Sequence, residues 1–169
     1  MINLPDYKKI HCIGIGGIGL SAVAEILMAR GYDISGSDMR ESDMTAKLAH
    51  DGAQIYIGHK AENVEGKDLI IYSSAISMEN PELAKAKELG IPAVTRAQAL
   101  GALMAEYDSS IAISGTHGKT TTTSMVSLIL KNAHKEPTIL VGGNLPEING
   151  NVYVGQNDYF VTEACEYMD

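Results

Sequence analysis

The chain has 169 residues, which is long for one domain and short for two. Its net charge of −8 at pH 7 argues against nucleic acid as a partner, because binding a phosphate backbone requires a basic face. No basic segment followed by an apolar one opens the chain, and no apolar run approaches the ~20 residues that cross a membrane, so we expect a cytoplasmic protein with no membrane partner.

The first predicted unit is a strand, a glycine loop, a helix and a second strand. The strand Lys8–Ile13 enters Gly14-Ile15-Gly16-Gly17-Ile18-Gly19, a G-x-G-x-x-G pattern. A helix then runs to Arg30, and a strand over Tyr32–Gly36 ends at Ser37-Asp38. An acidic residue ~20 positions beyond such a loop is typical of a Rossmann unit that holds a diphosphate at the helix N-terminus. Asp38 is then either an acceptor for a ribose hydroxyl or a turn residue.

Strands and helices continue to alternate up to about residue 104. The expected segments are a helix over Ser42–His50, strands over Gln54–Ile57 and Asp68–Tyr72, a helix over Pro81–Leu89 capped by Asn80, a strand over Ile91–Val94, and a helix from Thr95 to Met104. This order predicts an α/β fold, a Rossmann-like parallel sheet with helices on both faces. Ligands of such sheets bind outside the carboxyl ends of the strands, so the glycine loop, Ser37-Asp38 and Ser73-Ser74 are expected to share one ligand.

A polar stretch, Glu106–Ser109, predicts the boundary between a first domain, residues 1–106, and a second, residues 107–169. After it, Ile111-Ala112-Ile113 is expected to form a buried strand, and Met125–Leu130 lies in a helical pattern. Between them stands Ser114-Gly115-Thr116-His117-Gly118-Lys119-Thr120, which has the layout of a phosphate-binding loop although Ile113 stands where the strict pattern has glycine. Backbone amides, the helix N-terminus and Lys119 would hold phosphate, and the Thr120 hydroxyl would ligate Mg²⁺. The alternative is an ordinary helix N-terminus rich in threonine.

The last part of the chain predicts an incomplete P-loop α/β domain. A strand over Thr138–Val141 ends in Gly142-Gly143-Asn144, a polar stretch without a strand follows over Pro146–Asp158, and a strand over Tyr159–Thr162 ends in Glu163. An acidic residue at a strand end beside a phosphate loop is where a second Mg²⁺ ligand is expected. The alternative is a solvated acidic tail that includes Glu166 and Asp169. With so few strands, this part is expected to expose apolar surface, to pair with another copy, or to be held by the first domain.

The two cysteines, Cys12 and Cys165, lie far apart in strand-like runs, which favours buried thiols over a disulfide framework. No Cys-x-x-Cys or paired histidine spacing indicates a metal site of that kind. With no Trp and one Phe, the chain has little from which to build an aromatic stacking platform.

The motifs together resemble those of the Mur ligases of peptidoglycan synthesis, and the alanine-adding members most. Six segments carry the resemblance in order along essentially the whole chain: His11–Ser21, Ser35–Asp38, Tyr72–Ile76, Gly115–Thr123, Gly142–Asn144 and Glu163–Glu166. In that family, ATP phosphorylates the muramoyl carboxylate of UDP-N-acetylmuramate, and the amine of L-alanine attacks the acyl phosphate. The resemblance implies that the first domain binds the UDP part and that the second binds ATP and Mg²⁺.

The same resemblance implies roles for individual residues. The substrate would be bound by Gly14, Gly16, Gly17, Ile18, Gly19, Ser37, Asp38, Ser73, Ser74 and Asn144. ATP would be bound by Gly115, Thr116, His117, Gly118, Lys119, Thr120 and Thr121. Lys119, Thr120 and Glu163 are the catalytic candidates, and Thr120 and Glu163 are the expected Mg²⁺ ligands.

Mur ligases have three domains and this chain ends inside the second, so we expect it to bind nucleotides without ligating alone.

Three other functions compete with this one. A ligase that recycles a ready-made tripeptide onto UDP-N-acetylmuramate is disfavoured by the alanine-adding pattern Gly-Ile-Gly-Gly-Ile-Gly-Leu-Ser. An NAD-dependent oxidoreductase explains the first glycine loop but not Gly118-Lys119-Thr120, and a non-catalytic nucleotide-binding module explains both loops.

Overall fold

A computed structural model describes residues 2–156 and 158–164 of the chain. The chain divides into two compact units, Met1–Leu100 and Gly101–Asp169, and each is described by itself. The division falls inside helix α4 (Arg96–Met104), a few residues before the boundary expected from the sequence. Within the described residues, no helix is both long enough and apolar enough to cross a membrane.

The first unit is built on a five-stranded parallel sheet with the order β3-β2-β1-β4-β5. Its strands are β1 (Lys9–Ile13), β2 (Asp33–Asp38), β3 (Gln54–Ile57), β4 (Leu69–Tyr72) and β5 (Ala93–Thr95). The central strand β1 is buried from its second residue on, because helices cover both faces. The carboxyl ends of the strands therefore form one edge, where α/β folds bind ligands.

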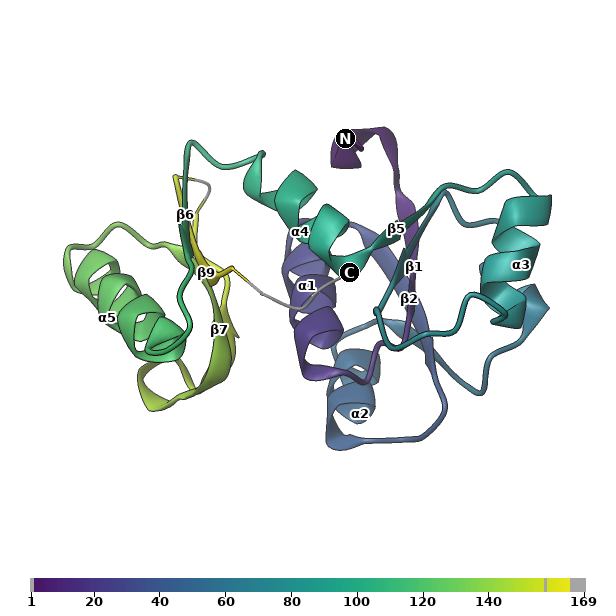
Figure 1. Cartoon of the computed structure of the whole chain (residues 1–169), viewed down its shortest axis with the longest axis horizontal. Helices are drawn as coiled ribbons and strands as arrows, with labels where there is room; N and C mark the ends of the chain where they lie inside the picture. The colour runs from purple at the N-terminus through teal and green to yellow at the C-terminus, as the bar shows by residue number, and fades with distance from the viewer. Residues whose placement is uncertain (1, 157, 165–169) are drawn as a thin grey trace. The chain divides into compact units, whose positions relative to one another are not determined.

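Helices α1 (Ile18–Ala29) and α3 (Pro81–Glu88) lie on opposite faces of this sheet, and α2 (Asp43–His50) lies on the side of α1 (Figure 1). Local sequence explains where they begin. The Ser42 and Thr45 side chains form a capping box at α2, and the Asn80 side chain accepts the Glu82 amide just before Pro81 at α3. On the α3 face the core contains Ile13, Val64, Ile70, Leu83 and Ala86. Two short 3₁₀ turns, Leu4–Asp6 and Ala61–Val64, complete the unit.

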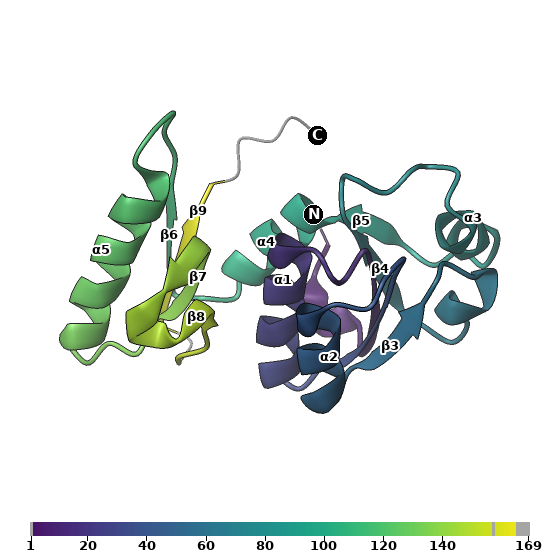
Figure 2. The ribbon, with the colours of Figure 1, turned by 90° about the horizontal axis from the view of Figure 1, so that it is seen from below.

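The second unit is a four-stranded sheet with the order β6-β9-β7-β8, and helix α5 (Lys119–Asn132) covers one face (Figure 2). The strands are β6 (Ser109–Ile113), β7 (Thr138–Leu145), β8 (Gly150–Tyr153) and β9 (Tyr159–Glu163), and a 3₁₀ turn over Pro146–Ile148 joins β7 to β8. Tyr107 packs edge-on against Phe160, with 4.9 Å between the ring centroids. The α/β fold class expected from the sequence is confirmed, since a parallel Rossmann-like sheet precedes a strand–loop–helix unit.

Three expectations for the second unit are wrong. Strand β6 is not buried: it lies at the edge of the sheet, so Ala112 is exposed. The polar stretch after residue 146 contains β8, which pairs antiparallel to β7 and makes the sheet mixed. Strand β7 was expected to end at Val141 but continues through Gly142-Gly143-Asn144. It pairs with β8 on both sides of this segment, at Leu140 and at Leu145, and the register shifts between these two pairs. On α5, Met125 and Ile129 are exposed, as expected for a unit with few strands.

Candidate functional site

In the first unit, the glycine loop between β1 and α1 is approached by residues from other strand ends. A methyl group placed on Gly16 would lie 2.8 Å from Asp38 Oδ2, at the end of β2. One placed on Gly14 would lie 3.3 Å from the Ser73 side chain, just after β4. Glycine at these two positions therefore lets Asp38 and Ser73 approach the loop backbone closely, which a bulkier side chain would prevent. The strand ends bring Asp38 and Ser73 to the loop, whereas Ser74 beyond them is exposed.

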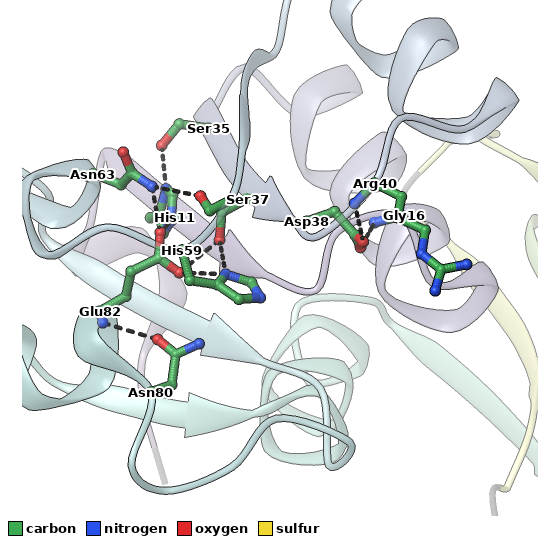
Figure 3. Close-up of polar contacts among 11 residues, drawn as sticks. His11, Gly16, Ser35, Ser37, Asp38, Arg40, His59, Asn63, Asn80 and Glu82 are labelled. Carbon is green, nitrogen blue, oxygen red and sulfur yellow. Dashed lines mark hydrogen bonds and ion pairs between the residues drawn. The ribbon is translucent and has the colours of Figure 1, made fainter.

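Strand β2 fixes the conformation of this loop through hydrogen bonds. The Ser37 carbonyl accepts the amides of Gly14 at 2.8 Å and Ile15 at 3.1 Å. The Asp38 carboxylate accepts the Gly16 amide at 2.9 Å, as Figure 3 shows. Helix α1 then begins at Ile18, and its N-cap residue Gly17 offers no side-chain cap; its first turn has no acidic residue. An uncapped helix N-terminus carries partial positive charge, so this loop is suited to an anion.

The Ser37 side chain makes a different contact from the Ser37 carbonyl and points toward Glu82 of helix α3. Its hydroxyl is fully buried and donates to Glu82 Oε2 at 2.6 Å. Ser37 thus contacts the glycine loop through its carbonyl and helix α3 through its hydroxyl. Its expected contact with a substrate remains a prediction, and the hydroxyl is already engaged by the protein.

The Glu82 carboxylate is the centre of a buried polar cluster that sequence reasoning missed (Figure 3). Besides Ser37, it accepts Asn63 Nδ2 at 2.6 Å, lies 2.9 Å from His59 Nδ1, and lies 3.4 Å from His11 Nε2. Burial raises the pKa of Glu82, but hydrogen bonds from His11, Ser37 and Asn63 outweigh it and hold the pKa below its usual value. The sequence signal for this cluster was His11, a polar residue inside the central strand β1.

In the second unit, the loop Ser114–Gly118 joins β6 to α5, so the strand–loop–helix connection expected of a phosphate loop is present. Gly115 and Gly118 have φ angles of 156° and 78°, and the second of these favours glycine. The Lys119 ammonium donates to the Gly115 carbonyl and so folds back over the loop. Helix α5 has no side-chain cap and no acidic residue in its first turn. Thr116 and His117 are exposed on the loop, and no hydrogen bond to their side chains occurs within the described residues.

The expected Mg²⁺ ligands, Thr120 and Glu163, lie beside neighbouring residues of β7. Glu163 Oε1 accepts the Gly142 amide at 2.8 Å, and a methyl group on Gly143 would lie 3.5 Å from the Thr120 methyl carbon. Carboxylate and hydroxyl oxygens, such as those of Glu163 and Thr120, are the hard donors that Mg²⁺ takes in small number. No group of three His, Cys, Asp or Glu residues suited to a metal occurs in the described ranges, and a Mg²⁺ ion shared with phosphate does not require one. Asn144 is exposed further along β7.

The family match and the most similar sequences found by comparison with known proteins agree with one another. Residues 9–108 match the family described as "Mur ligase family, catalytic domain". A UDP-N-acetylmuramate–L-alanine ligase from Clostridium botulinum is 61% identical over 160 residues, which are 95% of this chain and 35% of that protein. One from Alkaliphilus metalliredigens is 55% identical over 162 residues, which are 96% of this chain and 35% of that protein. The chain thus spans about a third of the length of these relatives.

Solved structures agree with the sequence comparisons. The UDP-N-acetylmuramate–alanine ligase of Thermotoga maritima matches with a TM-score of 0.83 and 39% identity, over 92% of this chain and 36% of that one. A UDP-N-acetylmuramate:L-alanyl-γ-D-glutamyl-meso-diaminopimelate ligase from Neisseria meningitides matches with a TM-score of 0.84 and 28% identity, over 95% of this chain and 53% of that one. Since the family match extends over more than half of the residues, the chain belongs to the Mur ligase family.

Proposed function

We propose that this chain carries the nucleotide-handling part of an ATP-dependent ligase that joins L-alanine to the muramoyl carboxylate of UDP-N-acetylmuramate. The observation that carries the proposal is the presence of two separate glycine loops, one in each unit, that each have the features expected of an anion-binding loop. Each loop leads into a helix with no side-chain cap and no acidic residue in its first turn. A ligase that consumes ATP and acts on a nucleotide-linked acid requires two such loops, whereas an NAD-dependent oxidoreductase requires one.

The two loops divide the ligands between them. We assign UDP-N-acetylmuramate to the first domain, residues 1–106, with its diphosphate at Gly14–Gly19 and with Asp38, Ser73 and Ser74 at the rim. We assign ATP to residues 107–169, with its phosphates at Gly115–Thr121. Asn144, exposed on β7, would face the substrate. The names of the relatives support L-alanine as the amino acid, and sequence identity of 55% to 61% favours it over the tripeptide of the Neisseria relative at 28%.

The chemistry has two steps. A carboxylate oxygen of the muramoyl group attacks the γ-phosphorus of ATP, and ADP leaves. The amine nitrogen of L-alanine then attacks the carbonyl carbon of the acyl phosphate, inorganic phosphate leaves as the amide forms, and the amine loses a proton. Such phosphoryl transfer depends on positioning and on neutralising charge. The Lys119 ammonium, which donates to the Gly115 carbonyl, supplies one positive charge.

Mg²⁺ would supply the remaining neutralisation when it is bound with ATP. The donor set fits this ion, because the Thr120 side chain and the Glu163 carboxylate both lie beside Gly142-Gly143. Glu163 also accepts the Gly142 amide, which orients its carboxylate. His117 is exposed at the loop, and we assign it no chemical role.

The test is calorimetric titration of the 169-residue chain with UDP-N-acetylmuramate and, separately, with NAD. Saturable binding of the UDP-sugar alone is the expected result. It should be lost in Gly16→Val, because even a methyl group there would lie 2.8 Å from Asp38 Oδ2. Gly101→Ala is the matched control, since a methyl group on Gly101 meets nothing within 4 Å. Binding of NAD instead would overturn the proposal.

A further inference from the structure

Strand β2 holds the glycine loop through three consecutive residues. A methyl group on Gly36 would lie 2.7 Å from Ile15 Cβ, so the Ile15 side chain packs directly on the strand. The Ser37 carbonyl accepts the amides of Gly14 and Ile15. The Asp38 carboxylate accepts the next amide of the loop. The shape of the loop therefore depends on where the carboxyl end of β2 lies.

A buried carboxylate holds the same strand end from its other side. Side chains alternate along a strand, so Ser35 and Ser37 both face helix α3, away from the loop. Ser37 Oγ donates to Glu82 Oε2 at 2.6 Å, the short distance of a hydrogen bond to a charged acceptor. Ser35 Oγ lies 2.9 Å from His11 Nδ1, and the other nitrogen of that ring lies 3.4 Å from Glu82 Oε1. Both hydroxyls on this face of β2 thus connect, directly or through one ring, to a single carboxylate, as Figure 3 shows.

The carboxylate itself has little freedom to move. Glu82 is the second residue of α3, and its backbone amide donates to the Asn80 side chain that caps the helix. Its side chain is 0% exposed, and Asn63 Nδ2 and His59 Nδ1 lie 2.6 and 2.9 Å from its two oxygens. A buried carboxylate held at its main chain and at both oxygens offers Ser37 an acceptor in a fixed position.

Stability alone does not account for this cluster. The strands of a parallel sheet that helices cover on both faces normally carry large apolar side chains. Replacing a buried charged group and its partners by well-packed apolar side chains is often neutral or stabilising. Hydrogen bonds, unlike apolar contacts, have a preferred distance and direction. The cluster therefore fixes the end of β2 more narrowly than apolar packing would.

We propose that Glu82 is a positioning residue of the nucleotide site: through Ser37, it sets the shape of the glycine loop from the opposite face of the sheet. This inference rests on the proposed function, in which that loop holds the nucleotide. Because Glu82 is fully buried, it acts on the ligand only through the strand. When the acceptor is lost, Ser37 is free to move, and its carbonyl no longer holds the amides of Gly14 and Ile15 in place.

Amide hydrogen exchange, followed by NMR in the ligand-free 169-residue chain, tests the route from Glu82 to the loop. In Glu82→Gln, exchange at the Gly14 and Ile15 amides should become about 10-fold faster relative to exchange at the Ile70 amide. Ile70 donates to the Pro92 carbonyl, between β4 and β5 and away from β2. Its amide therefore reports on unfolding of the whole unit.

Two control variants separate positioning from lost stability and from lost charge. Leu27→Ala removes a fully buried side chain from the last part of α1 and leaves the cluster intact, so exchange at all three amides should rise together. Glu88→Gln makes the same charge change at an exposed residue of α3 and should alter none of them. If the three amides also rise together in Glu82→Gln, the role of Glu82 is only structural and the inference is wrong.

Ser37→Ala removes the hydroxyl that links β2 to α3 and keeps the carbonyl that holds the loop. This change should by itself speed exchange at Gly14 and Ile15. Adding Glu82→Gln to it should have little further effect on these two amides, because the link is already lost. Unchanged exchange at the loop in Ser37→Ala, or additive effects of the two substitutions, would contradict a route through Ser37. The single variant gives this answer even if Glu82→Gln does not fold.

Calorimetric titration with UDP connects the loop to binding. Glu82→Gln should weaken UDP binding by roughly 3- to 30-fold, whereas Leu27→Ala and Glu88→Gln should bind UDP as the unchanged chain does. A folded Glu82→Gln with unchanged UDP affinity would overturn the inference and leave the proposed function standing. If the unchanged chain binds no UDP, the proposed function fails, and the exchange measurement still decides whether Glu82 shapes the loop.

Discussion

The Glu82 carboxylate should stabilise the first unit more than any exposed charge does. Replacing Glu82 with Ala removes the acceptor for Ser37 Oγ, Asn63 Nδ2 and His59 Nδ1 at 2.6, 2.6 and 2.9 Å. Ser37 and Asn63 are 0% and 6% exposed, so water does not easily replace the lost acceptor. Each buried donor left unsatisfied costs ~1–3 kcal/mol. Because His59 is partly exposed and is solvated more readily, we expect a total loss of about 3–5 kcal/mol.

Urea denaturation measures this loss, with NMR amide signals in β1 and β2 reporting on the first unit. For a slope of ~1–3 kcal/mol per molar urea, the midpoint should fall by more than about 1 M. Glu88→Ala is the matched control on the same helix. Its carboxylate is exposed and pairs only with Lys85, so its removal should cost less than about 0.5 kcal/mol. If Glu82→Ala shifts the midpoint no more than Glu88→Ala, the argument from buried donors is wrong.

The same cluster predicts a dependence of stability on pH. The folded-state pKa of Glu82 lies below its usual value of 4.5, so the unfolded chain takes up the proton first as pH falls. Its contribution is therefore complete above the unfolded pKa and is lost as pH falls through the folded pKa. The difference in unfolding free energy between the unchanged chain and Glu82→Gln should be constant near neutral pH and should shrink below pH 4.5. A difference that grows on acidification would refute this sign.

Three further substitutions or treatments have defined outcomes. Gly36→Ala places a methyl group 2.7 Å from Ile15 Cβ and 2.8 Å from the Cys12 carbonyl, so thermal unfolding should show a loss of about 1–3 kcal/mol that Gly101→Ala does not. Burial raises the pKa of the Cys12 thiol to about 12, so in a Cys165→Ser background Ellman's reagent at pH 8 should leave the folded chain unmodified and react once urea is added. Lys119→Ala should weaken the binding of Mg²⁺-ATP by roughly 10- to 100-fold in a titration, because it removes one charge-assisted contact. It should leave the affinity for UDP unchanged, because the contact lies in the second unit. An equal loss of UDP affinity would point to general unfolding.

The first unit was predictable from its sequence because its signals are local. Strand β4 is a short apolar run, Leu69-Ile70-Ile71, and Ser42 and the Asn80-Pro81 pair mark helix starts through contacts within three residues. The parallel direction of the strands then follows from the alternation of strands and helices, whereas their order in the sheet was not predicted. The second unit was less predictable. Strand β8 has only Val152 and Tyr153 as apolar residues, so no period-2 pattern distinguishes it from a loop.

The residues that the sequence did not reveal are those whose roles depend on long-range contacts. Glu82 looks like an ordinary acidic residue in the first turn of a helix, and only the packing of α3 on the sheet brings it to His11 and Ser37.

Ser37 shows why the site and the core of the first unit cannot be separated. Its carbonyl holds the amides of Gly14 and Ile15, and its hydroxyl is held by Glu82 on the opposite face of the sheet. A change at Glu82 that moves the end of β2 therefore also moves the acceptor that shapes the glycine loop, although no ligand would touch Glu82. The loop is pre-formed by two elements, β2 through its main chain and α3 through a buried carboxylate. That arrangement leaves the amides of Ile18 and Gly19 unpaired, so they remain available for an anion.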